Sequence, residues 1–208
     1  MQTIKNLLLK IRSKIPTKQI SHLSTKCNFF IPIMRKVTGI QLSTEQILKI
    51  TKAIKSVKNC KVLVFGLGND TPYWHYLSKN TLFIEDNQEW IDIVNNKIKV
   101  NTQIVKYKTK LADYKTLDAI IDSETLLLKI NGEYDVIIVD APMGYATDNP
   151  GRMSSIYTAS KLIKPNGTIF VHDCERPAED IWSKKIFGNN FSDIGMPILR
   201  EYVTNTNS

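Results

Sequence analysis

The chain has 208 residues, of which 42% are hydrophobic, so it fits one folded domain with a substantial core and is not an intrinsically disordered chain. Its longest apolar runs are far too short to span a bilayer, and its first residues show neither the apolar region nor the cleavage site of a signal peptide. The three scattered cysteines fit a reducing compartment and show no metal-ligand spacing. We therefore expect a cytoplasmic protein without a membrane anchor.

The net charge of +8 is concentrated near the N-terminus. Residues 1–61 carry thirteen Lys and Arg but a single acid, Glu45, whereas residues 62–208 carry fifteen basic and nineteen acidic side chains. A basic segment of this kind binds a polyanion, or it is simply a solvated lysine-rich face. Aromatic residues are not interleaved with the basic cluster as stacking platforms for bases would be, so we expect no stable nucleic-acid partner. The sequence leaves the oligomeric state open.

The predicted elements begin with a basic amphipathic helix over residues 4–15, which Pro16 ends. Residues 17–41 show no regular pattern and are expected to be irregular. A second helix begins where Ser43 is followed three residues later by Gln46, the pattern of a capping box, and its apolar stripe continues to about residue 58.

Further along the chain, short β-branched runs alternate with helical stretches. The runs predict buried strands at residues 62–65, 81–84, 103–107, 136–139 and 168–171, and an edge strand at 198–203. Continuous apolar runs separated by helices indicate a parallel sheet covered on both faces. We therefore predict an α/β fold with a doubly wound, mostly parallel, Rossmann-like sheet in residues 43–208, preceded by a basic N-terminal helical arm in residues 1–42. Such sheets bind their ligands at the C-terminal ends of the strands.

A glycine turn follows the first run. Gly66 and Gly68 let the backbone approach a ligand closely, but Thr71 stands where a dinucleotide-binding fingerprint has its third glycine. Asp70 would repel a pyrophosphate and attract a cationic sulfonium ligand that bears an amino group. The turn therefore favours S-adenosylmethionine over NAD, although an NAD-dependent oxidoreductase stays an alternative.

A spaced carboxylate follows the second run. Glu85 lies 19 residues after Gly66, close to the spacing of a carboxylate that accepts hydrogen bonds from the ribose hydroxyls of a bound nucleoside, and Asp86 comes next. Thr109 follows the third run and is expected near the adenine by topology alone. Because NAD and S-adenosylmethionine both present such a ribose, Glu85 does not separate them.

Residues suited to proton transfer follow the fourth and fifth runs: Asp140 after the fourth, His172 and Asp173 after the fifth. A sugar hydroxyl must lose its proton as it attacks a methyl group. Either His172 accepts this proton directly, or a divalent metal ion held by Asp140 and Asp173 lowers the pKa of the hydroxyl. Arg152, at a turn before a helix, is a candidate to bind an acidic group on the acceptor. Structural roles stay open for these residues, a helix N-cap for Asp173 and a surface ion pair for Arg152 among them.

Several blocks of the sequence resemble the glucuronoxylan 4-O-methyltransferase-like family of class I S-adenosylmethionine-dependent methyltransferases. The matching blocks are Phe65–Thr71 with Thr81–Asp86, Ile138–Tyr145 with Pro150–Met153, and Phe170–Arg176. The resemblance implies an S-adenosylmethionine-dependent O-methyltransferase that acts on a hydroxyl of a uronic acid or other sugar, with a divalent metal ion as a possible cofactor. The plant members carry a membrane anchor that this chain lacks, so we expect a soluble sugar, a nucleotide-sugar or a glycan assembled in the cytoplasm as the acceptor.

Carried over by position, the resemblance assigns residues to both halves of the site. Gly66, Gly68, Asp70, Glu85 and Asp140 line the cofactor, whereas Tyr145, Arg152, His172 and Asp173 face the acceptor. From their places beside the strand ends, we also expect Phe65, Asp86, Thr109 and Ala141 to bind the cofactor. We expect His172, Asp173 and Asp140 to be catalytic. The alternatives are a nucleic-acid or small-molecule methyltransferase, and a non-catalytic binding module that kept the fold.

Overall fold

The computed structural model describes residues 17–116, 120 and 122–204, so the helix predicted at residues 4–15 lies outside the described residues. The strands are β1 (Val62–Phe65), β2 (Thr81–Glu85), β3 (Asn101–Ile104), β4 (Tyr134–Val139), β5 (Ile163–Val171), β6 (Ser192–Ile194) and β7 (Leu199–Val203). The α-helices are α2 (Thr17–Lys26), α3 (Ile31–Thr38), α4 (Thr44–Lys55), α5 (Thr71–Leu77), α6 (Gln88–Lys97), α7 (Ser123–Lys129), α8 (Met153–Leu162) and α9 (Pro177–Phe187). Two short 3-10 helices are η1 (Asn28–Phe30) and η2 (Leu111–Asp113).

The strands form one sheet in the order β3-β2-β1-β4-β5-β7-β6. β1 to β5 pair in parallel, whereas β7 runs antiparallel to both β5 and β6. The chain first builds the sheet outward through β2 and β3 and then returns to the other side of β1 with β4. This reversal of direction between β1 and β4 creates the crevice in which doubly wound sheets bind ligands. The predicted α/β, doubly wound and mostly parallel fold is confirmed.

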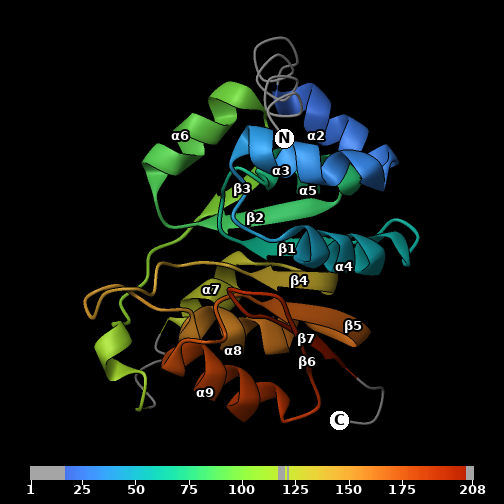
Figure 1. Ribbon diagram of the computed structural model, residues 1–208. Coiled ribbons are helices and arrows are strands. Elements are labelled where there is room, and N and C mark those ends of the chain that lie inside the picture. Colours follow the sequence, from blue (N-terminus) through green and yellow to red (C-terminus); the bar gives the residue numbers. More distant parts are fainter. Residues whose placement is uncertain (1–16, 117–119, 121, 205–208) are drawn as a thin grey trace.

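Two apolar clusters cover the two faces of the sheet because successive strand residues point to opposite faces. Val62 and Val64 of β1 pack in one cluster with α2, α3, α4 and α5. Leu63 and Phe65 pack in the other with α7, α8 and α9. Figure 1 shows α8 and α9 together in the lower part of the molecule and α2 and α3 in the upper part. Both faces of the central strands are therefore buried, as their uninterrupted apolar sequences require.

The capping box predicted before the second helix is present. The Ser43 hydroxyl accepts a hydrogen bond from the backbone N–H of Gln46 at 3.2 Å, and the Gln46 side chain accepts one from the backbone N–H of Ser43 at 2.8 Å. The Gln46 amide also donates to the carbonyl of Ile194 at 2.8 Å, which ties the start of α4 to β6. Such a cap stabilises a helix by about 1 kcal/mol.

Three of the predicted elements were wrong. The strand expected to be buried at residues 103–107 is β3 at Asn101–Ile104, which lies at one edge of the sheet with exposed or half-buried side chains. Residues 17–41, expected to be irregular, form α2, η1 and α3, and their Ile20, Ile31 and Met34 are buried in the same cluster as β1. The last strand was expected at the edge of the sheet, but β7 lies between β5 and β6, and the short β6 forms the edge. The boundary between an arm and a domain at residue 42 stays a prediction. None of the helices in the described part of the chain is long and apolar enough to cross a membrane.

Candidate active site

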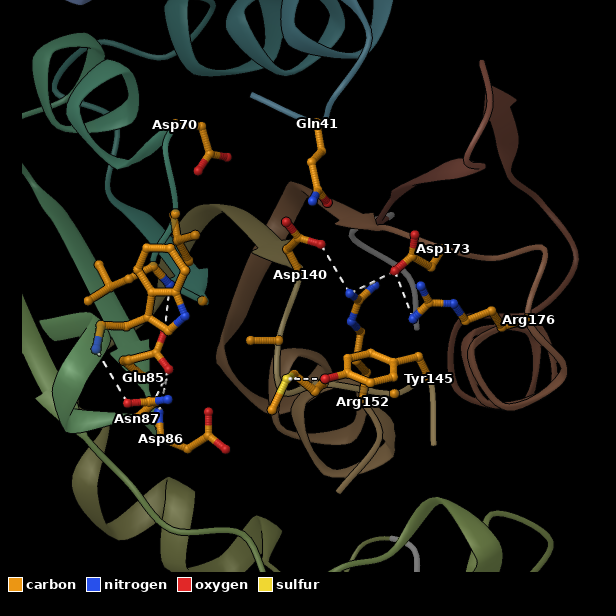
Figure 2. A pocket seen from close by; sticks show the side chains of 18 of the residues that line it. Gln41, Asp70, Glu85, Asp86, Asn87, Asp140, Tyr145, Arg152, Asp173 and Arg176 are labelled. Atoms are coloured by element: carbon orange, nitrogen blue, oxygen red, sulfur yellow. Dashed lines mark hydrogen bonds and ion pairs between the residues drawn. The ribbon is translucent and has the colours of Figure 1, made fainter. Parts of the chain in front are cut away.

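The register of the sheet brings the predicted strand-end residues together. Phe65 of β1 pairs with Ile84 of β2 and with Val139 of β4, and Val139 pairs with Val171 of β5. The residues that follow these strand positions lie side by side along one edge of the sheet: Gly66, Glu85, Asp140 and His172. A pocket of about 660 Å³ opens there (Figure 2). Its volume is that of a typical small-molecule or cofactor site.

The glycine turn forms the floor of this pocket. Gly66 has φ +115°, in the region that favours glycine, and a Cβ atom at this position would lie 3.0 Å from the Cβ atom of Ala141. The Gly68 backbone N–H donates to the Thr71 hydroxyl at 2.9 Å, so Thr71 stabilises the turn from the start of α5. Gly66, Gly68 and Ala141 all line the pocket, whereas the fully buried Phe65 side chain packs below it.

Glu85 holds the turn and the start of the next loop together. Its carboxylate accepts backbone N–H hydrogen bonds from Leu67 at 2.7 Å and from Asp86 and Asn87 at 3.0 Å each. Burial raises the pKa of Glu85 to about 7, even though the hydrogen bonds from Leu67 and Asn87 favour its charged form. A carboxylate has about four lone-pair sites, so Glu85 keeps room for roughly one further donor from a ligand in the pocket.

Asp70 lines the same side of the pocket next to the glycine turn. One of its oxygens accepts a hydrogen bond from the indole N–H of Trp74 at 2.8 Å. Burial, and next the nearby charge of Asp140, raise the pKa of Asp70 to about 6. With Glu85 and Asp86, Asp70 makes this side of the pocket acidic, which suits a ligand with a positive charge.

The opposite side of the pocket is a network of charges centred on Arg152. The guanidinium of Arg152 contacts Asp140 Oδ1 at 3.2 Å and Asp173 Oδ2 at 2.8 Å, and it donates to the carbonyl of His172 at 2.7 Å. The His172 ring contacts both carboxylates through Nδ1, at 2.9 Å from Asp140 Oδ1 and 3.3 Å from Asp173 Oδ1. Figure 2 shows Arg152 between Asp140 and Asp173.

This network fixes the charge states of its members. Burial on its own would raise the pKa of Asp140, but the hydrogen bond with His172 and the charge of Arg152 outweigh it, and the pKa is lowered. Burial on its own would lower the pKa of His172, yet its hydrogen bond to Asp140 and the charges of Asp140 and Asp173 raise it. Asp140 is therefore ionised at neutral pH, and the protonated form of His172 is favoured.

His172 lies behind the carboxylates and does not line the pocket. The side chain is 4% exposed, and its Nε2 atom is buried without a hydrogen-bond partner. Asp140, by contrast, lines the pocket with 36% of its side chain exposed. Asp140 is therefore more accessible from the pocket than His172, for which the sequence suggested the role of direct proton acceptor. The catalytic role of His172 stays a prediction.

Asp140, His172 and Asp173 offer possible metal-ligating atoms that lie within 4.8 Å of one another. The guanidinium of Arg152, however, already contacts both carboxylates. As arranged, these residues do not fit a resident divalent ion, because the ion would have to displace Arg152. The metal ion expected from the sequence stays a prediction.

Most of the predicted site residues line one pocket, and the exceptions are Phe65, His172 and Thr109. Thr109 is buried with its backbone N–H bonded to Asp122 and does not line the pocket. Arg152 does line it, but as the centre of the charge network rather than as an open cation. The lining residues that sequence reasoning missed are Gln41, Val64, Leu67, Asn87, Gln88, Trp90, Met143, Gly144 and Arg176.

The strand order and the site at the switch point define a class of protein, the class I S-adenosylmethionine-dependent methyltransferase fold. Two solved structures, each 14% identical to this chain, share the fold. A putative caffeoyl-CoA O-methyltransferase from Staphylococcus aureus has a TM-score of 0.52, with 91% of this chain and 99% of that chain covered. The T. Thermophilus RsmC 16S rRNA methyltransferase, solved with AdoMet and guanosine, has a TM-score of 0.51, with 76% and 42% covered.

The sequence places the chain within one family of this class. The family model described as IRX15/IRX15L/GXM matches residues 45–129 and 127–195, so the chain belongs to this family. Glucuronoxylan 4-O-methyltransferase 3 of Arabidopsis thaliana is 37% identical over 163 residues, which cover 65% of this chain and 55% of the relative. Arabinogalactan O-methyltransferase 2 of the same plant is 28% identical over 176 residues, covering 70% and 60%. The chain thus spans little more than half the length of these curated relatives.

Proposed function

We propose that this protein is an S-adenosylmethionine-dependent O-methyltransferase that acts on a hydroxyl of a sugar, with a uronic acid or another glycan unit as the acceptor. The observation that carries the proposal is the division of one pocket into two halves. One half joins a glycine turn to acidic side chains and suits a cationic nucleoside cofactor. The other half presents an ionised carboxylate, Asp140, to a second ligand. The names of the sugar-methylating relatives support the acceptor class.

The described residues fit S-adenosylmethionine on three counts. Gly66 and Gly68 line the pocket without side chains, Glu85 keeps a free acceptor site for a ribose hydroxyl, and Asp70 offers a carboxylate to the amino group. The bound cofactor supplies a methyl group on a positively charged sulfur, which an oxygen nucleophile attacks. The acidic lining from Asp70 and Glu85 to Asp140 stabilises such a positive charge.

Asp140 is the group best placed to take the proton of the acceptor hydroxyl. His172 and Arg152 both engage Oδ1, whereas Oδ2 has no protein partner among the described residues. In the proposed mechanism the acceptor hydroxyl donates a hydrogen bond to Oδ2, and its proton passes to this oxygen as the O–C bond to the methyl group forms. His172 and Arg152 fix the orientation of the carboxylate. A base held in this way typically contributes about 10²- to 10⁴-fold to the rate.

Transfer of a labelled methyl group from S-adenosylmethionine tests the proposal directly. Glucuronic-acid-substituted xylo-oligosaccharides, arabinogalactan and total RNA would be offered as separate acceptors to the wild type and to Asp140→Asn. We expect label in the glycans, none in the RNA, and loss of transfer in the variant with binding of S-adenosylhomocysteine retained. Labelling of RNA alone would move the protein to the nucleic-acid methyltransferases, and absence of cofactor binding would overturn the methyltransferase assignment.

A further inference from the structure

The two halves of the pocket differ in their balance of charge. The lining near the glycine turn has Asp70, Glu85 and Asp86, and the residues that the structure describes place no basic side chain beside them. The acceptor half has Asp140 and Asp173 opposed by two guanidiniums, those of Arg152 and Arg176, and these two are the basic side chains among the described residues that line the pocket. An anionic group on an acceptor therefore has two possible partners.

Arg152 is already committed to the protein. Its side chain is 6% exposed, and both terminal nitrogens are engaged, Nη1 by the carbonyl of His172 and Nη2 by Asp140 and Asp173. Removing any of these contacts to bind an acceptor would leave a buried charge without its partner, which costs several kcal/mol. The structure therefore argues against Arg152 as the residue that binds an acidic group of the acceptor.

Arg176 is open to the pocket. Its side chain is 33% exposed, and within the described part of the chain it makes one ion pair, from Nη1 to Asp173 Oδ2 at 3.0 Å. It lies at the N-cap of α9, directly after the strand-end residues of β5. Figure 2 shows its guanidinium on the acceptor side of the pocket, beside Asp173. A guanidinium has five N–H donors in a planar fork, so one ion pair leaves most of them available.

The surroundings of Arg176 hold it in place without using up its donors. Asp173, its ion-pair partner, has φ +63° and a side chain only 6% exposed, so this carboxylate is a fixed anchor. A Cβ atom on Gly144 would lie 3.8 Å from Arg176 Nη1 and 2.9 Å from Glu179 Oε1, so the loop at Gly144 passes close over both. Neither carboxylate oxygen of the buried Glu179 accepts a hydrogen bond. The next residue of that loop, Tyr145, is 72% exposed and lines the pocket.

We propose that Arg176 binds the carboxylate of an acidic sugar acceptor and makes the protein select uronic acids over neutral sugars. This inference rests on the proposed function and names the specificity-determining residue within it. A planar guanidinium pairs with a carboxylate through two parallel N–H···O bonds, which a lysine ammonium cannot reproduce. Loss of such a charged contact lowers affinity by about tenfold or more.

Binding of two matched sugars to the full chain saturated with S-adenosylhomocysteine tests the inference. Methyl β-D-glucuronide and methyl β-D-glucoside differ only in having a carboxylate or a hydroxymethyl group on the ring. Their dissociation constants would be measured by NMR titration for the wild type, Arg176→Gln, Arg176→Lys and the control Lys52→Gln. Lys52 is an exposed residue of α4 outside the pocket, so its variant removes the same charge elsewhere.

We expect the wild type and Lys52→Gln to bind the glucuronide at least about tenfold more tightly than the glucoside. Arg176→Gln should lose this preference, and Arg176→Lys should keep part of it, while both bind S-adenosylhomocysteine within about twofold of the wild type. A wild type without preference for the glucuronide, or a preference that survives Arg176→Gln, would overturn the inference. Failure of the wild type to bind S-adenosylhomocysteine would instead contradict the proposed function.

Discussion

Replacement of Glu85 by glutamine tests the cofactor half of the site most sharply. The Glu85 carboxylate accepts three backbone hydrogen bonds, from Leu67, Asp86 and Asn87. The sequence alone suggested that it accepts from both ribose hydroxyls, but three of its roughly four lone-pair sites are already used. The structure therefore predicts one hydrogen bond from a ribose hydroxyl to Glu85 rather than two.

The size of the effect follows from this count. Loss of one hydrogen bond to a charged acceptor costs about 1.5–3 kcal/mol, which corresponds to a rise of about 10- to 150-fold in the dissociation constant. The glutamine side chain also has an NH₂ group in place of one oxygen, so the N–H of Leu67 or those of Asp86 and Asn87 would face a donor. An unsatisfied donor of this kind lowers the free energy of unfolding by about 1–3 kcal/mol.

Calorimetric titration with S-adenosylhomocysteine at pH 8.5, where wild-type Glu85 is ionised, measures the binding effect, and thermal unfolding measures the effect on stability. Glu89→Gln is the matched control, because Glu89 is exposed in the first turn of α6 and lies outside the pocket. We expect the control to bind as the wild type does. Unchanged affinity of a folded Glu85→Gln protein, or an equal loss in Glu89→Gln, would refute the assignment of Glu85 to the cofactor.

Four further outcomes follow from the charges of the site. Binding of S-adenosylhomocysteine should tighten as pH rises through about 6 to 7, because the raised pKa values of Asp70 and Glu85 place the ionisation of both groups in this window. An affinity that calorimetry finds independent of pH would contradict this. Asp140→Asn should lower the rate of methyl transfer by about 10²- to 10⁴-fold, with little change in cofactor affinity; a near-normal rate would exclude Asp140 as the base. Burial raises the pKa of Glu179, so the folded state binds its proton more tightly and stability is lost as pH rises through the folded pKa. The melting temperature of Glu179→Gln relative to the wild type should therefore increase from pH 4 to pH 8, and a constant difference would argue against a buried carboxylate. The Arg152→Gln variant should be less stable than the wild type and should bind Mn²⁺ more tightly, because the carboxylates of Asp140 and Asp173 lose their contacts with Arg152. Equal Mn²⁺ affinities of the two proteins in a metal titration would contradict this.

The sequence was sufficient to predict the sheet and the row of residues at its edge. Uninterrupted β-branched runs are buried on both faces in any parallel sheet, so their ends could be placed along one line before the structure was known. Gly66, Glu85 and Asp140 were found in this way, because each directly follows such a run. The helices at residues 17–38 were missed because they are short and contain Pro32. The spacing of Ile31, Met34 and Val37 was the signal that could have revealed α3.

The sequence could not predict which charged side chains stay open to the ligand. Arg152 and Arg176 both occur in the blocks that resemble the family, and both contact Asp173. The two side chains differ in exposure because of contacts among the loops after β4, before α8 and after β5, and no local sequence pattern encodes such contacts. His172 was placed correctly along the sheet, but the direction of its ring is set by Asp140 and Asp173. Gln41 was missed because the segment before α4 had been taken as irregular.

The position of Arg152 connects the proposed proton acceptor with the proposed acceptor-binding residue inside the acceptor half of the pocket. The same guanidinium holds Asp140, which we propose takes the proton, and Asp173, which anchors Arg176. Asp173 contacts both guanidiniums and the His172 ring, so its substitution should loosen Arg176, which we propose binds the acceptor, and Arg152, which orients Asp140. A substitution of Asp173 should therefore impair both specificity and rate, although Asp173 takes no proton in the proposed mechanism.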